Sequence, residues 1–339
     1  MNSTLAAHRH TPFEYNWYQR SVFFINTYIL VVQIVLGCSG NFLNLIVLLS
    51  KAMRSRTNLI FAAMAFADLF FLLLQTATVL FYSGLIMNSL WFRNGFSQVF
   101  AGMSNWFSAI SIFCMMYATI ERVQVFRSPF RTSKRSASSR FFCTIFLIVV
   151  FSFVLTFIHF INPKERTKIN YSKFIVLMSS ILIVVIPLFV SGALNILLIM
   201  ALKKNTIPKS MLDEGQAQQS LILARNKTER KVTIMVTVIL TSFIICNAPG
   251  AMIFFFKEQN PEFNKTSRNV FIQTVSNSLT VTGKVLNFVL FCLSSDHFRA
   301  LLRKRICHLL GGCGCHNKDN RRNTYSTATK TMSMPLNDL

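Results

Sequence analysis

Seven long apolar runs alternate with polar, charged segments along the chain. The runs cover residues 21–50, 59–82, 95–120, 141–161, 174–202, 232–256 and 269–295. A transmembrane helix needs about 20 consecutive apolar residues, and each run reaches roughly that length. The pattern therefore predicts an all-α protein in which residues 21–295 form a bundle of seven transmembrane helices.

The composition agrees with a protein that crosses a membrane several times. Of the 339 residues, 52% are hydrophobic and only 14% are charged, whereas about a quarter of the residues in soluble domains are charged. The net charge of +23 would suggest nucleic-acid binding in a soluble protein, but most of it falls on one side of the predicted membrane. We therefore expect no nucleic-acid partner. No C-x-x-C pair and no intramembrane His/Asp/Glu cluster is present, so we expect no metal, no cofactor and no enzymatic activity.

The charges of the segments between the runs indicate how the chain is oriented in the membrane. If the N-terminus is outside, the cytoplasmic side carries 24 Lys/Arg and 7 Asp/Glu, and the outer side carries 10 and 4. The positive-inside rule favours this arrangement, so we predict a multi-pass plasma-membrane protein with residues 1–20 as an extracellular tail. Three sequons then lie outside, where glycosylation can occur: Asn2, Asn170 and Asn264. A fourth, at Asn226, falls inside and should stay unmodified.

A short segment with apolar and basic faces follows the last run. In residues 296–306, apolar side chains recur at helical spacing and Arg and Lys cover the other side. This pattern predicts an amphipathic helix on the membrane surface. Residues 307–339 are predicted to form a cytoplasmic tail. Its cysteines are candidates for palmitoylation, with free thiols as the alternative: Cys307, Cys313 and Cys315.

Two charged residues interrupt the runs, Asp68 in the second and Lys284 in the seventh. Each lies about ten residues from the cytoplasmic end of its helix, which corresponds to about 15 Å at about 1.5 Å per residue. Asn41 reaches the same depth in the first run. Charges inside a membrane are costly and almost always pair. We therefore predict that Lys284 pairs with Asp68; the alternative is that Lys284 snorkels to the membrane surface.

Short motifs stand in order along the runs. They are Gly40-Asn41 in the first, Asp68 in the second, Glu121-Arg122-Val123 at the end of the third, Pro187 in the fifth, Cys246-Asn247-Ala248-Pro249 in the sixth, and Asn287-Phe288-Val289-Leu290-Phe291 in the seventh. On these motifs, roughly residues 40–306 resemble the rhodopsin-like (class A) G-protein-coupled receptors. The seventh run and the segment after it are most similar to invertebrate FMRFamide-type peptide receptors and the related nematode Srw chemoreceptor-like group.

The sequence also departs from the pattern of that family. Ser97 stands where the family usually has a disulfide-bonded cysteine, and the loop of residues 162–173 has no cysteine. Asn247 replaces the aromatic residue of the sixth helix. Asn195 and Phe291 replace two tyrosines that normally meet near the third-helix arginine. The conformation of the extracellular loop and the contacts of those tyrosines therefore do not carry over.

The resemblance implies a receptor that binds an extracellular ligand and activates a heterotrimeric G protein. Arrestin and a receptor kinase are implied further partners, and the Ser/Thr-rich residues 324–333 would be their target; the alternative is an inert polar tail. The implied ligand-binding residues lie in the outer half of the bundle: Gln75, Thr78, Ser104, Asn105, Ser108, Ser179, Asn247, Phe254, Gln273, Asn277 and Thr280. Hydrogen bonds between helices are the alternative role of the polar members.

The charges on the predicted outer side limit the chemical class of ligand that we expect. Ser104 stands where amine receptors have an aspartate, which argues against a biogenic amine. The predicted outer net charge of +6 favours an acidic or neutral peptide, although it does not suit a cationic RF-amide. We predict a neuropeptide ligand. A chemosensory receptor for a small molecule, and a seven-span transporter or channel, are the alternatives.

The resemblance also implies which residues change during activation. They are Glu121, Arg122, Glu229, Ile112, Pro187, Phe243, Pro249 and Asn287. We predict a resting ion pair between Arg122 and Glu229, and local breaks of the helical hydrogen-bond ladder at the two prolines. Ile112, Pro187 and Phe243 match the family's packing switch, and an ordinary apolar core is their alternative role. The family commonly holds a sodium ion at its second-helix aspartate, and here Lys284 is expected to replace it within a buried polar centre of Asn41, Asp68, Ser111 and Lys284.

Overall fold

The structure is a computed structural model, and it describes residues 12–53, 55–85, 97–127, 139–161, 165, 168, 171–204, 216–260 and 262–309. The secondary-structure elements within these residues are all helical, and no β-strand occurs among them. The chain divides into two compact units, Met1–Ser295 and Asp296–Leu339. The first contains the long helices, and the second contains α11 (Asp296–Leu309).

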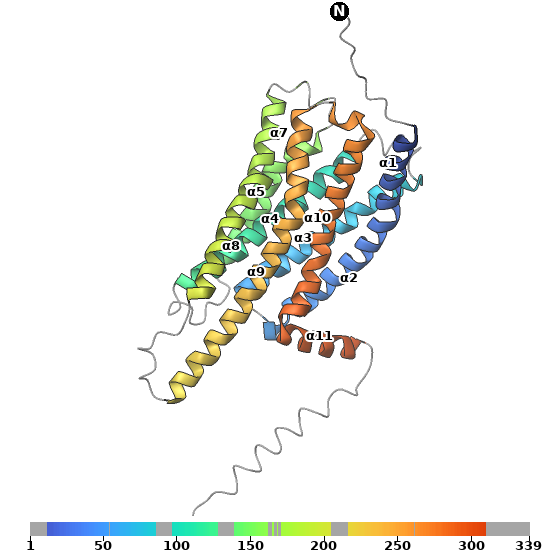
Figure 1. Cartoon of the computed structure of the whole chain (residues 1–339). Helices are drawn as coiled ribbons and strands as arrows, with labels where there is room; N and C mark the ends of the chain where they lie inside the picture. The colour runs from blue at the N-terminus through green and yellow to red at the C-terminus, as the bar shows by residue number, and fades with distance from the viewer. Residues whose placement is uncertain are drawn as a thin grey trace, which may run out of the picture. The chain divides into compact units, whose positions relative to one another are not determined.

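Seven helices in the described part of the chain are long and apolar enough to cross a membrane, which confirms the predicted fold (Figure 1). The first three are α1 (Pro12–Phe24) with η1 (Ile25–Ile29) and α2 (Leu30–Leu48), then α3 (Arg56–Tyr82), then α4 (Ser97–Arg127). The fourth is α5 (Ser139–Thr156) with η5 (Phe157–Phe160), and the fifth combines α7 (Ser172–Ser180), η6 (Ile181–Val185) and α8 (Ile186–Lys204). The last two are α9 (Gln216–Gln259) and α10 (Ser267–Ser294), and short turns η2 (Lys51–Met53) and η8 (Phe263–Lys265) precede α3 and α10.

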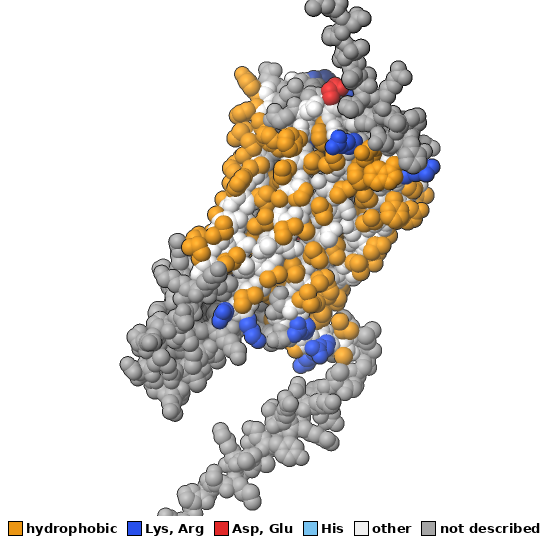
Figure 2. All heavy atoms as spheres, in the orientation of Figure 1, with side chains coloured by type: hydrophobic (Ala, Val, Ile, Leu, Met, Phe, Trp, Pro, Cys, Tyr) orange, Lys and Arg blue, Asp and Glu red, His pale blue; other side chains and the backbone are white. Residues whose placement is uncertain are grey.

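The outer surface of these helices is apolar. Phe146 on α5, Phe189 on α8 and Ile245 on α9 are exposed over 65%, 76% and 66% of their surface. Figure 2 shows hydrophobic side chains spread over the helices, with Lys and Arg side chains near the ends of that apolar band. A large exposed apolar surface of this kind indicates contact with a membrane.

The first helix begins at Pro12, earlier than the apolar run at residues 21–50 predicts. The ring centroids of Trp17 and Tyr18 lie 5.2 and 5.5 Å from that of Phe271 on α10. Aromatic contacts at this distance stabilise the turns that carry them. The polar beginning of α1 is therefore held by packing, which the hydrophobic pattern alone could not show.

The two prolines in the spans have different local effects. Pro187 follows η6, a π-turn in which the N–H of Ile186 donates to the carbonyl of Ile181. Proline cannot make the regular hydrogen bond, and the π-turn places Pro187 at the beginning of a new α-helix, where proline is tolerated. The predicted break of the ladder is therefore confirmed at Pro187. Pro249, by contrast, lies inside α9, which continues on both sides of it.

Two glycines let the first helix approach its neighbours closely. A Cβ atom at Gly37 would lie 2.6 Å from Cδ1 of Leu72 on α3, and a Cβ at Gly40 would lie 2.8 Å from Cβ of Phe288 on α10. These separations are too short for real carbon atoms, so a larger residue would push the helices apart. Small residues at such points allow transmembrane helices to pack.

Gly40→Ala is therefore expected to lower the stability of the bundle by about 1–3 kcal/mol, the usual cost of overpacking a core. Gly192→Ala is the matched control, because a Cβ at Gly192 on α8 would meet nothing within 4 Å, and alanine favours a helix. Thermal unfolding of the detergent-purified protein measures both variants. Equal melting temperatures for the two would contradict the close contact at Gly40.

Candidate functional site

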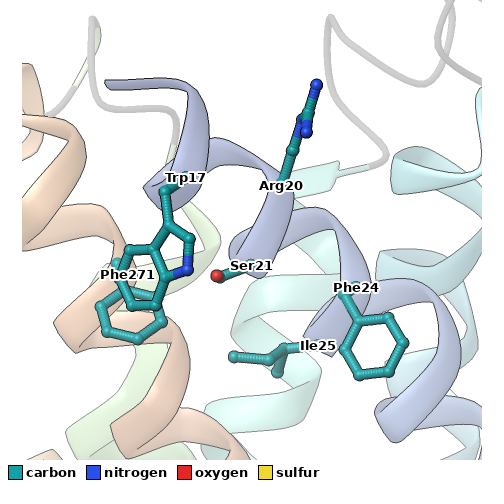
Figure 3. A pocket seen from close by; sticks show the side chains of 6 residues that line it. All are labelled: Trp17, Arg20, Ser21, Phe24, Ile25 and Phe271. Carbon is teal, nitrogen blue, oxygen red and sulfur yellow. The ribbon is translucent and has the colours of Figure 1, made fainter. Parts of the chain in front are cut away.

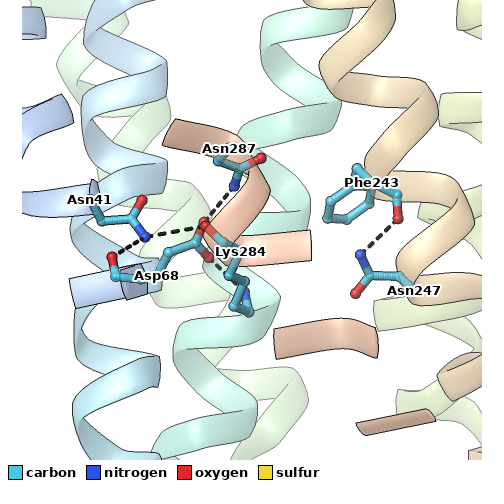
Figure 4. Close-up of polar contacts among 7 residues, drawn as sticks. Asn41, Asp68, Phe243, Asn247, Lys284 and Asn287 are labelled. Carbon is cyan, nitrogen blue, oxygen red and sulfur yellow. Dashed lines mark hydrogen bonds and ion pairs between the residues drawn. The ribbon is translucent and has the colours of Figure 1, made fainter. Parts of the chain in front are cut away.

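A buried ion pair joins the second and seventh helices. The ammonium nitrogen of Lys284 on α10 lies 2.6 Å from Oδ1 of Asp68 on α3, and the two side chains are 6% and 0% exposed. Asn287, one turn further along α10, donates from Nδ2 to Oδ2 of Asp68 over 2.8 Å. Both carboxylate oxygens therefore have a partner (Figure 4). The predicted pairing is present, and Lys284 does not snorkel.

Further contacts surround this pair. The Lys284 nitrogen lies 4.6 Å from the centroid of the Phe71 ring, one turn after Asp68 on α3, which is a cation–π distance. Asn41 on α2 donates from Nδ2 to the carbonyl oxygens of Gly37, at 2.9 Å, and Lys284, at 3.3 Å. Ser111 on α4 is also buried. The polar centre thus connects α2, α3 and α10.

Lys284→Met keeps the length of the side chain but removes its charge. We expect it to destabilise the protein by about 3–5 kcal/mol, because Asp68 would remain as an unpaired buried charge. Adding Asp68→Asn should restore most of the loss, since an amide carries no charge. Melting temperature and surface expression of all four proteins in this double-mutant cycle measure the coupling. Additive losses would mean that the two side chains are independent.

Arg122, near the end of α4, bonds to the beginning of α3. Its Nη2 donates to Oγ1 of Thr57, and the two residues are 7% and 3% exposed. Thr57 lies in the first turn of α3, which is capped by the Ser55 hydroxyl accepting from the N–H of Asn58 at 3.2 Å. The side chain of Glu229 lies outside the described residues, so its pairing with Arg122 stays a prediction. The described contact of Arg122 joins the second and third helices.

The residues that replace the two tyrosines of the family pattern make contacts of their own. Asn195 on α8 donates from Nδ2 to Oγ1 of Thr241 on α9 at 2.9 Å. Phe291 on α10 is 1% exposed and packs edge-on against Phe61 on α3, with ring centroids 5.1 Å apart. Asn195 therefore bonds the fifth helix to the sixth, and Phe291 fills the core between the seventh helix and the second.

Four further switch candidates are buried: Glu121, Ile112, Pro187 and Phe243. Glu121 is 9% exposed and accepts a hydrogen bond from the hydroxyl of Tyr117, one turn earlier, at 3.4 Å. Ile112, Pro187 and Phe243 are all buried in the bundle. This burial agrees with a packing switch and with an ordinary core alike, so the switch stays a prediction.

The predicted ligand-binding side chains make their described hydrogen bonds within their own helices. These bonds run from Ser179 to the Val176 carbonyl at 2.8 Å, from Asn247 to the Phe243 carbonyl at 2.8 Å, from Thr280 to the Ser276 carbonyl at 3.3 Å, and from Thr78 to Oε1 of Gln75 at 3.5 Å. Phe254 on α9 packs against His159 of η5, with ring centroids 6.1 Å apart. The other candidates are partly or fully exposed: Ser104, Asn105, Ser108, Gln273 and Asn277. Ligand binding by these residues stays a prediction.

Sequence reasoning missed a polar contact between the first and seventh helices. Nε2 of Gln33 on α2 lies 3.0 Å from Oγ of Ser278 and 2.8 Å from Oγ1 of Thr282, both on α10. Similarly, Trp106 on α4 donates from Nε1 to the Val149 carbonyl on α5 at 3.1 Å. The signal was available, because a polar side chain inside an apolar run tends to bond to another helix.

Several predicted modification sites lie outside the described residues: Asn2, Asn170, Cys313 and Cys315. The backbone of Asn264 belongs to η8, and Cys307 belongs to α11. None of these positions is tested by the fold. Among the described residues, no group of three or more His, Cys, Asp or Glu side chains is arranged to hold a metal ion.

Residues 40–291 match the family model of the 7 transmembrane receptor (rhodopsin family). The chain belongs to this family of receptors. As a rhodopsin-family receptor it is a multi-pass integral membrane protein, and membership implies that it binds a ligand and couples to a G protein. The matched region contains the buried polar centre and the Arg122–Thr57 contact.

Relatives of this rhodopsin-family receptor agree with the assignment. It is 28% identical over 316 residues to F59B2.13 of Caenorhabditis elegans, whose name places it among G-protein coupled receptors, and the match covers 81% of this chain and 71% of the relative. It is 24% identical over 290 residues to the substance-P receptor of Rattus norvegicus, covering 79% of this chain and 67% of that receptor. The crystal structure of squid rhodopsin superposes with a TM-score of 0.68 at 16% identity, over 94% of this chain and 88% of that one, which supports the fold alone.

Proposed function

We propose that this receptor binds an extracellular peptide and activates a heterotrimeric G protein in the plasma membrane, with its N-terminus outside. The similarity to the substance-P receptor over 79% of the chain carries the peptide proposal. The outer net charge of +6 that this topology gives favours an acidic or neutral peptide. A transporter or channel is disfavoured, because the matching family model describes receptors.

A ligand can activate such a receptor only by binding one arrangement of the helices better than another. Two of the hydrogen bonds between helices involve positions that the family resemblance assigns to activation. The Arg122–Thr57 bond holds α4 to α3, and the Asn195–Thr241 bond holds α8 to α9. We assign the Arg122–Thr57 bond to the resting arrangement.

A G-protein activation screen on the full-length receptor, with separate peptide and small-molecule libraries, tests the proposed ligand class. We expect nucleotide exchange in response to an acidic or neutral peptide. Activation by small molecules alone would replace the peptide proposal with a chemosensory one. Flux across receptor-containing vesicles in the absence of G-protein turnover would contradict the receptor proposal itself.

Thr57→Val removes the hydroxyl that accepts from Arg122 but keeps the shape of the side chain. Basal G-protein turnover should rise about tenfold, because hydrogen bonds to charged groups contribute about 1.5–3 kcal/mol and a tenfold change needs about 1.4 kcal/mol. Thr76→Val is the matched control, since Thr76 is exposed on the same helix and bonds to its own Leu73 carbonyl. Unchanged basal turnover at equal surface expression would show that the Arg122–Thr57 bond does not stabilise the resting arrangement.

The proposed topology makes a separate prediction about glycans. Glycosidase treatment should lower the apparent mass of the receptor expressed in animal cells, and the shift should shrink in Asn2→Gln, Asn170→Gln or Asn264→Gln. Asn226→Gln is the control, because the proposed topology puts that sequon on the cytoplasmic side and glycosylation acts on the outer side. A shift that depends on Asn226 would reverse the orientation.

A further inference from the structure

A pocket opens between the first helix and α10, near the N-terminal end of each. Its volume is about 370 Å³, and its lining residues are Trp17, Arg20, Ser21, Phe24, Ile25 and Phe271 (Figure 3). Pockets that hold small ligands usually measure about 300–1,000 Å³. None of the residues assigned above to peptide binding lines this pocket.

The rings of Trp17 and Phe271 form one wall of the pocket, and Tyr18 packs against both from outside the lining. The ring centroids of Trp17 and Tyr18 lie 5.1 Å apart. They lie 5.2 and 5.5 Å, respectively, from the ring centroid of Phe271 on the neighbouring helix α10. Three rings from two helices restrict each other's orientation. In Figure 3, Phe24 lies across the pocket from the Trp17–Phe271 pair, and Ile25 lies between them on the floor.

A positive charge stands at the rim. The exposed side chain of Arg20 is directed away from the apolar floor (Figure 3). No acidic residue is among the six that line the pocket, so nothing in the lining neutralises the guanidinium. A guanidinium binds a carboxylate or a phosphate with two parallel hydrogen bonds. The rim is therefore suited to an anionic head group.

The pocket lies at the depth where a membrane surface is expected. The candidate spans of the two helices begin at Trp17 and Ser267, and tryptophan and arginine favour this boundary. Below the pocket, Phe24 contacts Tyr28 with ring centroids 5.5 Å apart. These two side chains are 55% and 57% exposed, so an apolar strip continues from the pocket toward the membrane interior.

We propose that this pocket binds a single-chain anionic amphiphile, whose carboxylate or phosphate pairs with Arg20 and whose hydrocarbon chain lies over Phe24 and Tyr28. A small inorganic anion would leave the apolar floor unfilled, and a neutral chain would forgo the guanidinium. A peptide fits less well, because its backbone polar groups would lack partners along a strip that faces hydrocarbon.

A brominated fatty acid tests the proposal, because bromine quenches tryptophan fluorescence on contact. With the full-length receptor in phosphatidylcholine nanodiscs, we expect saturable quenching that Trp17→Phe removes. Trp106→Phe should retain it, because Trp106 bonds to α5, away from the pocket. A brominated alcohol of the same chain length should need about tenfold higher concentration, since it lacks the charge-assisted bond.

Two arginine variants separate a site from general partition into the bilayer. Arg20→Gln should raise the half-saturating concentration of the fatty acid about tenfold. Arg268→Gln should leave it unchanged, because Arg268 is an exposed residue at the beginning of α10 that does not line the pocket. Ser21→Phe, which fills the centre of the pocket, should abolish saturation.

Equal half-saturation for the acid and the alcohol, or equal effects of Arg20→Gln and Arg268→Gln, would overturn the proposal. Quenching that never saturates would mean binding as an adventitious additive only, and would overturn it as well. None of these readouts involves a G protein. A negative result would therefore leave the proposed receptor function untouched.

Discussion

The pair of Asp68 and Lys284 is the interaction that constrains the arrangement of the helices most strongly. Two opposite charges buried inside the bundle cannot separate without leaving an unpaired ion, so α3 and α10 are held at one relative depth. Asn287 and Phe71 complete the surroundings of the two ions. Because Asp68 and Phe71 lie one turn apart on α3, and Lys284 and Asn287 one turn apart on α10, these contacts also define how the two helices are rotated about their axes.

The contacts of the first helix follow from the same constraint. Asn41 bonds to the backbone carbonyl of Lys284 itself, so α2 is positioned against the residue that carries the charge. Gly40 makes that approach possible by leaving room for Phe288, and Gln33 adds a polar bond nearer the N-terminal end of α10. Small and polar residues thus hold these helices together alongside the buried apolar cluster between them.

Hydropathy predicted the seven spans, and depth predicted the ion pair. Hydropathy succeeded because a membrane span needs about 20 apolar residues. The ion pair could be predicted because a charge in an apolar run has very few possible partners, and counting residues from the cytoplasmic ends left Asp68 opposite Lys284. Polar side chains such as Gln33 and Arg122 are less informative, since each can bond to several helices or to the backbone, and hydropathy does not define helix rotation. The early beginning of α1 depends on the contact of Trp17 with Phe271, which has no signal in either local sequence.

The residue before Lys284 lies directly against the sixth helix. A Cβ at Gly283 would lie 2.8 Å from Cβ of Cys246 and 3.9 Å from Nδ2 of Asn247, so α9 touches the bare backbone of α10 there. A shift of α9 at this level must either move that backbone or open a gap beside it. The buried pair resists movement of α10, because one ion would lose its partner. Any rearrangement is therefore easier for α9, which contains Pro249 three residues after Cys246 and lacks the hydrogen bond that a proline cannot make.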